Sequence, residues 1–348
     1  MCKGNALCMR IQVVGFGNVG KSLIGLIDEK KEILKSLGVS LKVVSISDSR
    51  GTAREKRGLV LGDVLRRKED GWKGFKPYFE GYSALSAIRD LAADVVVELT
   101  PSTSSGEPGL SHIKAALGRR KSVVTANKGP LVVAYEDLMN LAKRKRVRLL
   151  YEATVAAHLP VFCMIESCFR ADQLVRVEGI LNGTTNFIIG QMEKGRDFQA
   201  CLDHATKEGW AETNYLDDVD GIDAARKTVI LANSYFKRGA KLEDVKIDGI
   251  RNIGKMIEKA RSQNKRVKLI CNILRKEASV QMSVSPRLVA LDDPFAAVNG
   301  GDMALKLFFK TSQQIFVSAQ FTGVKQTAYA VLNDIIKMAF PTQACRMV

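Results

Sequence analysis

The chain has 348 residues, of which 46% are hydrophobic and 26% are charged. This length is sufficient for two domains, and the composition excludes a disordered or fibrous chain. Charged residues interrupt every hydrophobic segment, which argues against a transmembrane helix. The N-terminal segment lacks the apolar core of a signal peptide, so we expect a cytoplasmic protein that does not act at a membrane.

The formal net charge of +16 raises the question of a nucleic-acid partner. Basic residues are densest at 143–148, with a smaller group at 66–68. Neither group is interleaved with aromatic residues, and the first follows a helical pattern, where cations stabilise the C-terminal end of a helix. We therefore expect small-molecule ligands, to which the positive charge would attract phosphate or carboxylate groups, and no nucleic acid.

The chain contains seven cysteines and three histidines. The cysteine number is odd and no CxxC pair occurs, so neither a disulfide framework nor a zinc site is expected. We expect reduced thiols that are mostly buried as small hydrophobic residues, and leave Cys2, Cys8 and Cys345, near the termini, open as exceptions.

The first element in chain order is a short apolar strand at 9–14. A glycine-rich turn, a helical pattern over 21–38 and a second strand ending at residue 48 follow it. Strand, GxGxxG, helix and strand form the arrangement that a dinucleotide-binding fingerprint requires, because the glycines let the backbone approach a pyrophosphate at the helix N-terminus. The predicted cofactor contacts of this turn are Gly15, Phe16, Gly17, Asn18, Val19 and Gly20.

The end of the second strand bears on the choice between NAD and NADP. Asp48 could accept a hydrogen bond from a ribose 2′-hydroxyl group, whereas Arg50 could bind a 2′-phosphate. Arg50 and the positive net charge favour NADP, and NAD stays open. We interpret residues 52–92 as a basic helical segment followed by a loop rich in glycine and aromatic residues, to which we assign no chemistry.

Two further strands of this half end in polar residues. Ligands of doubly wound sheets bind at the carboxyl ends of the strands, so Thr100 and Ser102 are predicted to contact the cofactor. Lys128 follows the next strand, in a turn before a helix predicted at 135–145. Its position after a parallel strand indicates the same ligand-binding edge of the sheet as Thr100 and Ser102. The alternative is a solvated loop lysine without a role in binding.

Beyond residue 150 the strands no longer alternate with helices at βαβ spacing, which indicates a mixed or antiparallel sheet covered by helices. Strands are predicted near 174–180, 267–275, 279–284, 304–309 and 314–319, with a loop around Pro286 and Pro294. A glycine turn and a helix then close the chain and are expected to return to the first domain.

The predicted fold is therefore α/β, with a Rossmann-type nucleotide-binding domain and an α+β catalytic domain built on a mixed sheet. Residues 1–150, completed by 323–348, would form the NAD(P)-binding domain. Residues 151–322 would form the domain for catalysis, substrate binding and dimerisation.

Asp223 and Lys227 lie four residues apart at the start of a helical pattern, so their side chains share one helix face. An ordinary surface salt bridge is one explanation of the spacing. A carboxylate that orients a lysine for proton transfer is the other. The spacing alone leaves both open.

Six segments together resemble one family, the homoserine dehydrogenases, in order and spacing over nearly the whole chain. The chain is similar to short members, and we expect no C-terminal regulatory domain or fused aspartate kinase. The segments are GFGNVG (15–20), VVTANKGPL (123–131), YEATVAAHLP (151–160), GILNGTTNFI (179–188), GWAETNYLDDVDGIDAARKTVILAN (209–233) and GVKQTAYAVLNDI (323–335).

The resemblance implies NAD(P)H-dependent interconversion of aspartate 4-semialdehyde and homoserine, a step of threonine and methionine biosynthesis, by a homodimer. It implies that Lys227 is the general acid and that Lys128 lies between nicotinamide and substrate. The substrate contacts it implies are Glu212, Asp223, Gly183 and Thr184. The cofactor contacts it implies are Gly17, Asn18, Val19, Thr100, Lys128 and Gly323. Backbone carbonyls of Glu152, Val155, Ala157 and Leu159 would bind a monovalent cation such as sodium.

Three departures from the family pattern leave the substrate open. Ala156-Ala157-His158 replaces a glycine-rich loop, Asn214-Tyr215 replaces aspartate-proline, and Lys325-Gln326 stands where small residues and an acid are common. Tyr215 would add bulk and a hydroxyl group near the substrate. A second interpretation is therefore a paralogous NAD(P)-dependent oxidoreductase that acts on another hydroxy acid or aldehyde. A third, suggested by the net charge, is a catalytically silent homologue that binds NADP or nucleic acid.

Overall fold

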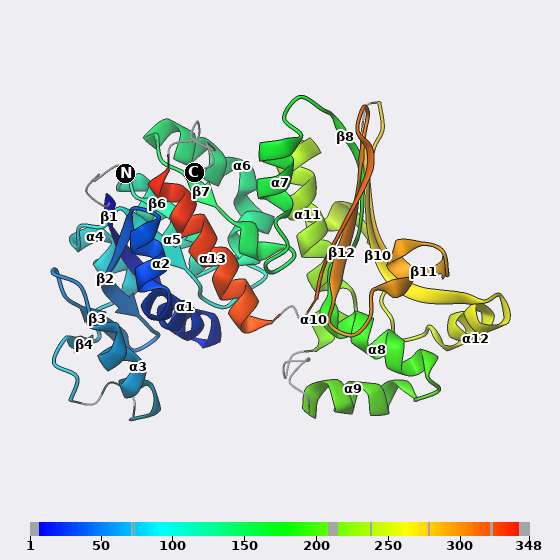
Figure 1. Cartoon of the computed structure of the whole chain (residues 1–348), viewed down its shortest axis with the longest axis horizontal. Helices are drawn as coiled ribbons and strands as arrows, with labels where there is room; N and C mark the ends of the chain where they lie inside the picture. Colours follow the sequence, from blue (N-terminus) through cyan, green and yellow to red (C-terminus); the bar gives the residue numbers. More distant parts are fainter. Residues whose placement is uncertain are drawn as a thin grey trace. The chain divides into compact units, whose positions relative to one another are not determined.

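The computed structural model describes residues 7–340 apart from 71, 73, 208–214, 237–238, 278 and 321–322. The chain divides into two compact units (Figure 1). The first contains Met1–Ala157 and Gly323–Val348, and the second contains His158–Thr322. The C-terminal helix thus belongs to the first unit.

A seven-stranded sheet forms the centre of the first unit. Its strands are β1 Leu7–Val14, β2 Val39–Ser47, β3 Gly51–Arg54, β4 Tyr78–Glu80, β5 Val95–Glu98, β6 Ser122–Thr125 and β7 Leu149–Leu150. They follow the order β4-β3-β2-β1-β5-β6-β7, and all run in one direction except β3, which is antiparallel to both of its neighbours. The strand order reverses between β1 and β5, and dinucleotides bind at such a reversal.

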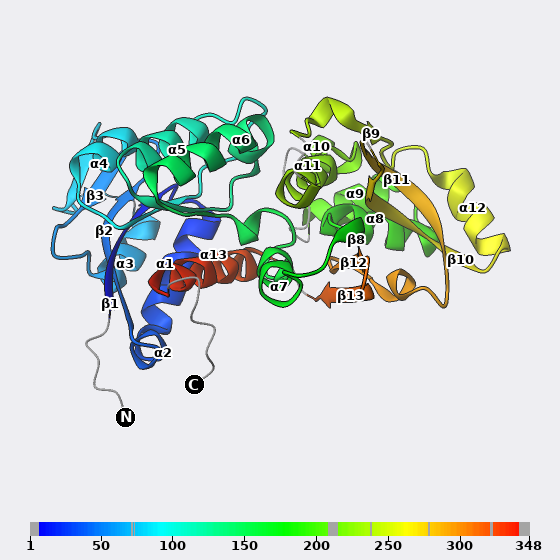
Figure 2. The same cartoon turned by 90° about the horizontal axis from the view of Figure 1, so that it is seen from above.

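Helices cover both faces of this sheet (Figure 2). They are α1 Asn18–Glu29, α2 Lys31–Ser36, α3 Leu61–Asp70, α4 Ala84–Asp90, α5 Gly109–Gly118, α6 Lys128–Lys145 and α13 Val324–Ala339. The helices α1 and α13 pack together on one face, and α4, α5 and α6 lie on the other. Because both faces are covered, the parallel strands are mostly apolar, and Ile11, Val13 and Val97 are completely buried.

Three local predictions for this unit are wrong. The helix expected over 21–38 is divided at Lys30, although its apolar pattern continues into α2. The strands β3 and β4 occupy part of the region interpreted as helix and loop, because strands this short show no clear alternation. Lys128 is the first residue of α6, not a turn residue, because the Asn127 side chain accepts a hydrogen bond from Gly129 N–H (3.0 Å) and caps the helix.

The second unit contains the mixed sheet that the sequence predicts. Its strands are β8 Leu174–Ile180, β9 Val245–Ile247, β10 Lys265–Arg275, β11 Val280–Ala290, β12 Met303–Phe309 and β13 Gln313–Ala319. Their order is β13-β12-β8-β10-β11-β9, with antiparallel pairs except for β11 and β9.

Pro286 lies within β11, opposite Leu269 of β10, and not in the predicted loop. The other neighbour of β11 is β9, which pairs only with residues 282–284. Beyond Val284 that side of β11 has no partner strand among the described residues, so a residue without an N–H group is tolerated there.

The remaining helices complete the two units. They are α7 Val161–Cys168, α8 Gly183–Glu193, α9 Phe198–Lys207, α10 Leu216–Val219, α11 Ile222–Phe236 and α12 Gly254–Ser262, with the 3-10 helices η1 Glu152–Thr154, η2 Leu242–Asp244 and η3 Pro294–Ala297. In the second unit, Cys271 of β10 contacts Ala224 of α11, whereas Ile270 packs in a cluster with Phe295 and Phe316. Neighbouring residues of a strand face opposite sides, so α11 covers one face of the sheet and η3 part of the other.

No helix in the described part of the chain is both long and apolar enough to cross a membrane. Five cysteines fall within the described residues, and all five are free thiols. Only Cys201 and Cys271 are buried, so the expectation of mostly buried thiols is wrong for the described set.

A buried lysine connects β1, α4 and the start of β6. Lys121 is 6% exposed and donates hydrogen bonds to Gln12 Oε1 (2.9 Å) and to the carbonyl oxygens of Ile88 and Leu91 (2.6 Å each). These carbonyl groups lie in the last turn of α4 and directly after it, where a helix leaves acceptors unsatisfied. Burial lowers the pKa of Lys121 to about 8.

We expect Lys121→Met to lower the free energy of unfolding by about 2–3 kcal/mol, because three buried acceptors lose their donor. An unfolded chain holds this proton up to a pKa of about 10.4. Between about pH 8 and pH 10 the unfolded state therefore binds more protons at residue 121, and the contribution of Lys121 makes stability rise with pH. Urea unfolding of both proteins across this range, under reducing conditions, measures the effect. Identical pH slopes would contradict the assignment.

Candidate active site

The glycine-rich turn between β1 and α1 is shaped by close backbone contacts. Gly15 has a φ of +99°, and a Cβ atom there would lie 2.6 Å from the backbone of Leu99. A Cβ atom at Gly20 would lie 2.3 Å from the Gly15 carbonyl oxygen. Gly17 and Asn18 are exposed, and no side chain of the described residues caps α1. The amides of its first turn are thus available to an anion such as a pyrophosphate.

Four donors surround the Asp48 carboxylate at the end of β2. Oδ1 accepts hydrogen bonds from the N–H groups of Arg50 and Gly51 and from the Tyr78 hydroxyl group, each at 2.9 Å. Oδ2 accepts one from Trp72 Nε1 at 2.7 Å. Burial raises the pKa of Asp48, but these hydrogen bonds outweigh burial and hold it below its usual value. Three of these donors lie on Oδ1 and one on Oδ2, so most acceptor positions of the carboxylate are occupied and Oδ2 keeps one for a ligand.

Aromatic side chains connect the glycine-rich turn to this end of β2. Trp72 stacks on Tyr78 with ring centroids 5.0 Å apart, and Phe16 of the turn packs on Trp72 at 5.4 Å. Burial and the hydrogen bond to Asp48 raise the pKa of Tyr78 to about 12. A cavity of about 520 Å³ lies beside these rings and is lined by Arg50, Trp72, Gly74, Phe75, Lys76, Tyr78 and Glu80. The loop without assigned chemistry thus forms a wall of a cavity at the predicted adenosine side.

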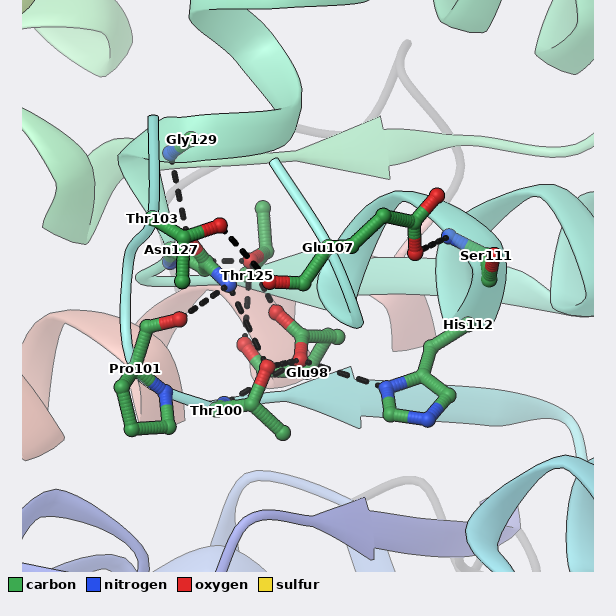
Figure 3. Close-up of polar contacts among 10 residues, drawn as sticks. All are labelled: Glu98, Thr100, Pro101, Thr103, Glu107, Ser111, His112, Thr125, Asn127 and Gly129. Atoms are coloured by element: carbon green, nitrogen blue, oxygen red, sulfur yellow. Dashed lines mark hydrogen bonds and ion pairs between the residues drawn. The ribbon is translucent and has the colours of Figure 1, made fainter. Parts of the chain in front are cut away.

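The polar residues predicted at the ends of β5 and β6 lie together. Ser102 Oγ accepts a hydrogen bond from Gly129 N–H at 2.9 Å, next to Lys128 in the first turn of α6. The Thr100 hydroxyl group accepts a hydrogen bond from Asn127 Nδ2 at 3.3 Å (Figure 3). The two loops therefore form one polar surface at the carboxyl edge of the sheet.

In the second unit, α11 places Lys227 beside Asp223. Lys227 Nζ lies 2.7 Å from Asp223 Oδ2 and donates a hydrogen bond to the Leu181 carbonyl oxygen at 2.6 Å. The side chains of the pair are only 9% and 11% exposed. The surface salt bridge that the spacing left open is therefore wrong for this pair, and the ammonium group is held in a sheltered position.

Asn182 and Asp218 complete this cluster, and the sequence predictions missed both. Asn182 caps α8 by accepting a hydrogen bond from Thr185 N–H at 2.8 Å. Its Nδ2 donates to Asp218 (2.6 Å) and to Asp223 (2.9 Å). Two carboxylates and one ammonium group thus meet beside the predicted substrate turn 183–184. Two sequence signals could have indicated these residues: an asparagine directly before the GTT turn, and the acidic run at 217–220.

One further predicted substrate residue, Tyr215, flanks this cluster, because its carbonyl oxygen accepts a hydrogen bond from Asp218 N–H at 3.1 Å. Glu212 and Asn214 lie outside the described residues. Tyr215 is half-buried and directly precedes α10, which carries Asp218. Gly323 is exposed and precedes the first residue of α13 in the first unit.

The four residues predicted to bind a cation are all buried. Ala157 has a φ of +50°, in the left-handed region. The N–H group of Glu152 donates to Asp334 of α13 at 2.9 Å, and Lys337 forms ion pairs with both carboxylates. Burial raises the pKa of Asp334 to about 6. The helix α13 thus holds the start of this loop.

The first unit is a dinucleotide-binding domain by its strand order and glycine-rich turn, and the second holds a sheltered lysine among carboxylates. Together they define an NAD(P)-dependent oxidoreductase. Sequence models of the homoserine dehydrogenase NAD-binding domain and of homoserine dehydrogenase match residues 15–152 and 160–336. The chain belongs to the homoserine dehydrogenase family.

Individual relatives are similar over almost their whole length. The chain is 37% identical to homoserine dehydrogenase of Methanocaldococcus jannaschii (94% of this chain, 98% of the relative). It is 35% identical to an NAD(+)-dependent homoserine dehydrogenase of Pseudomonas canavaninivorans (94% and 95%). Among solved structures, homoserine dehydrogenase of Thermoplasma acidophilum has a TM-score of 0.84 at 29% identity (96% and 99% covered). A hyperthermophilic archaeal homoserine dehydrogenase in complex with NADPH has a TM-score of 0.82 at 28% identity (96% and 99%).

We expect Asn182→Ala to lower the free energy of unfolding by about 1–2 kcal/mol, since it removes a helix cap and the amide between two carboxylates. Asn182→Ser keeps a capping oxygen and should recover about half of that loss. Chemical denaturation of the three proteins measures both effects. An alanine variant as stable as the wild type would show that Asn182 does not hold the cluster together.

Proposed function

We propose that this enzyme interconverts aspartate 4-semialdehyde and homoserine, that Lys227 is its proton donor, and that it prefers NADP(H). The observation that supports this most strongly is the sheltered Lys227–Asp223 pair beside the 183–184 turn. Both residues lie in a segment that carries the family resemblance.

The chemistry of aldehyde reduction explains why a lysine is needed. Bound NADPH supplies a hydride, and the aldehyde oxygen then carries negative charge until it receives a proton. An ammonium group can stabilise that charge and donate the proton. Asp223 at 2.7 Å and the Leu181 carbonyl group fix the position of Lys227 Nζ. We propose that Lys128 lies between the nicotinamide and the substrate.

An amino-acid aldehyde also needs anionic partners for its own ammonium group. Asp218 and Asp223, joined by the Asn182 amide, supply two carboxylates. We assign them to the substrate ammonium group, with Glu212 as a third acid. The 183–184 turn and Tyr215 would contact the rest of the substrate.

We expect Lys227→Ala to reduce kcat for aspartate 4-semialdehyde by about 10³-fold, as general acid catalysis is worth about 10²–10⁴. NADPH affinity should stay within about two-fold, because the glycine-rich turn belongs to the other unit. NADPH oxidation and fluorescence titration measure the two quantities.

A matched control is Lys246→Ala, which removes an exposed lysine of β9 and should leave both quantities unchanged. Near-normal turnover by Lys227→Ala would mean that another group donates the proton. A wild-type protein that does not oxidise NADPH with aspartate 4-semialdehyde would contradict the proposed function itself.

The preference for NADP rests on the surroundings of Asp48. Its carboxylate is already hydrogen-bonded by four donors, whereas Arg50 is exposed and lines the adjacent cavity with Lys76. A second cavity of about 340 Å³ shares Phe75 and adds Arg66 and Arg67. A 2′-phosphate group would meet more cations than acids there, since Glu80 and Asp63 are the acids that line the two cavities. Relatives include both an NAD(+)-dependent enzyme and one with NADPH bound.

Arg50→Ala should lower kcat/KM for NADPH by about ten-fold or more while leaving that for NADH within about two-fold, because only NADPH carries the phosphate. Arg57→Ala, at another exposed arginine of the same region, serves as control. Equal losses with both cofactors would contradict a 2′-phosphate contact.

We further propose that the enzyme is a cytoplasmic homodimer in threonine and methionine biosynthesis. A monovalent cation such as sodium would bind the backbone carbonyl groups of the Glu152–Leu159 loop, since hard cations prefer oxygen ligands. We assign dimerisation to the face of the second sheet opposite α11. On this face Arg176, Glu178 and Arg287 form ion pairs.

A further inference from the structure

Glu98 is a completely buried carboxylate at the carboxyl end of β5 (Figure 3). It lies opposite Val14 of β1 on one side and Thr125 of β6 on the other, at the reversal of strand order. Its only ion-pair partner among the described residues is His112, whose Nδ1 lies 3.6 Å from Oε1 and has no hydrogen-bond partner. Burying a carboxylate is costly unless donors satisfy it, so the neighbours of Glu98 indicate what it holds.

The principal neighbour is Thr100, a predicted cofactor residue. Its N–H group donates to Glu98 Oε1 at 3.1 Å, and its hydroxyl group donates to the same oxygen. The hydroxyl group of Thr125 lies 3.4 Å from Oε2 and 3.0 Å from the Glu98 carbonyl oxygen. Thr100 is therefore held through both its backbone and its side chain.

Asn127 carries this connection to the start of α6. Its Nδ2 donates to Thr100 Oγ1 (3.3 Å) and to the Pro101 carbonyl oxygen (3.4 Å), while its Oδ1 accepts the Gly129 N–H group. Lys128 lies between Asn127 and Gly129 in the sequence and is the first residue of α6. A chain of hydrogen bonds thus runs from the Glu98 carboxylate to the helix turn that carries Lys128 (Figure 3).

Close packing leaves this cluster little freedom. A Cβ atom at Gly109 would lie 2.5 Å from Asn127 Nδ2 and 3.0 Å from Glu98 Oε2. On the other side, a Cβ atom at Gly15 would lie 2.8 Å from the nitrogen of Thr100. Thr100 is enclosed between the glycine-rich turn and the carboxylate, so a change at Glu98 must be transmitted to Thr100.

The strand order assigns this cluster to one half of the cofactor. In doubly wound sheets the dinucleotide spans the reversal point, with its adenosine ribose at the end of the second strand. The nicotinamide half then lies over β5 and β6, where Thr100 and Lys128 stand. Glu98 itself has no exposed surface and cannot touch a ligand.

We propose that Glu98 is a positioning residue for the nicotinamide half of NADP(H), acting through Thr100 and Asn127. The inference rests on the proposed cofactor, and it adds a residue that neither the sequence pattern nor the resemblance singled out. We expect the adenosine half, held by the glycine-rich turn and Arg50, to depend on Glu98 much less, because the Glu98 carboxylate accepts hydrogen bonds from Thr100 and Thr125 and not from that turn.

Glu98→Gln tests this because it keeps the shape of the side chain and changes only its hydrogen bonding. One side-chain oxygen becomes an amide group that cannot accept a hydrogen bond, and the remaining oxygen is neutral, so the hydrogen bonds from Thr100 lose their charge assistance. We expect the Kd for NADPH to rise about ten-fold and kcat to fall. The Kd for 2′-phospho-ADP-ribose, which lacks nicotinamide, should stay within about two-fold.

Glu107→Gln is the matched control, since within the described part of the chain this exposed carboxylate on the same loop accepts a hydrogen bond only from Ser111 N–H. Asn127→Asp is a second variant that keeps the helix cap and removes the donor to Thr100. It should also weaken the binding of NADPH and not that of 2′-phospho-ADP-ribose. If Glu98→Gln does not fold, this variant alone tests the proposed role.

Different outcomes test the proposed function and the role of Glu98. A wild-type protein that neither binds NADPH nor reduces the aldehyde overturns the proposed function. A functional wild type with an unchanged NADPH Kd in the variants overturns the role of Glu98. Equal weakening of NADPH and 2′-phospho-ADP-ribose also overturns it, because a general structural role would not distinguish the two ligands. Selective weakening of NADPH supports it.

Discussion

The buried ion pair of Lys227 and Asp223 is the interaction on which the second unit's site depends. Removing an ammonium group and a carboxylate from water costs several kcal/mol per ion, unless further hydrogen bonds satisfy them. The Leu181 carbonyl group and the Asn182 amide supply those bonds. The strand end, the cap of α8 and the first turn of α11 are therefore interdependent. In the proposed function, the ammonium group they hold supplies the charge that aldehyde reduction requires.

The first unit uses carboxylates in a related way. Asp48 at the end of β2 binds the N–H groups that follow it, and Glu98 at the end of β5 binds Thr100. In both places the acid fixes a loop by accepting hydrogen bonds from its N–H groups. These acids act by holding the backbone of the edge at which a dinucleotide binds.

The elements that depend on local signals could be predicted from the sequence. The glycine-rich turn, the parallel strands and the mixed second sheet follow from glycine positions and from hydrophobic periodicity. Asp223 and Lys227 were found because helical spacing places them together. Asn182 was missed because its partner Asp223 lies 41 residues away, and the Asp48 cluster because Tyr78 lies 30 residues away. Only the fold brings such residues together.

Transfer of deuterium tests the central claim most directly. Aspartate 4-semialdehyde would be incubated with the enzyme and NADPH deuterated at both C4 positions of the nicotinamide, and the product analysed by mass spectrometry. The account predicts homoserine that carries a single deuterium on its C4 carbon, with the hydroxyl proton coming from the enzyme. Absence of homoserine, or homoserine without the label, would contradict it.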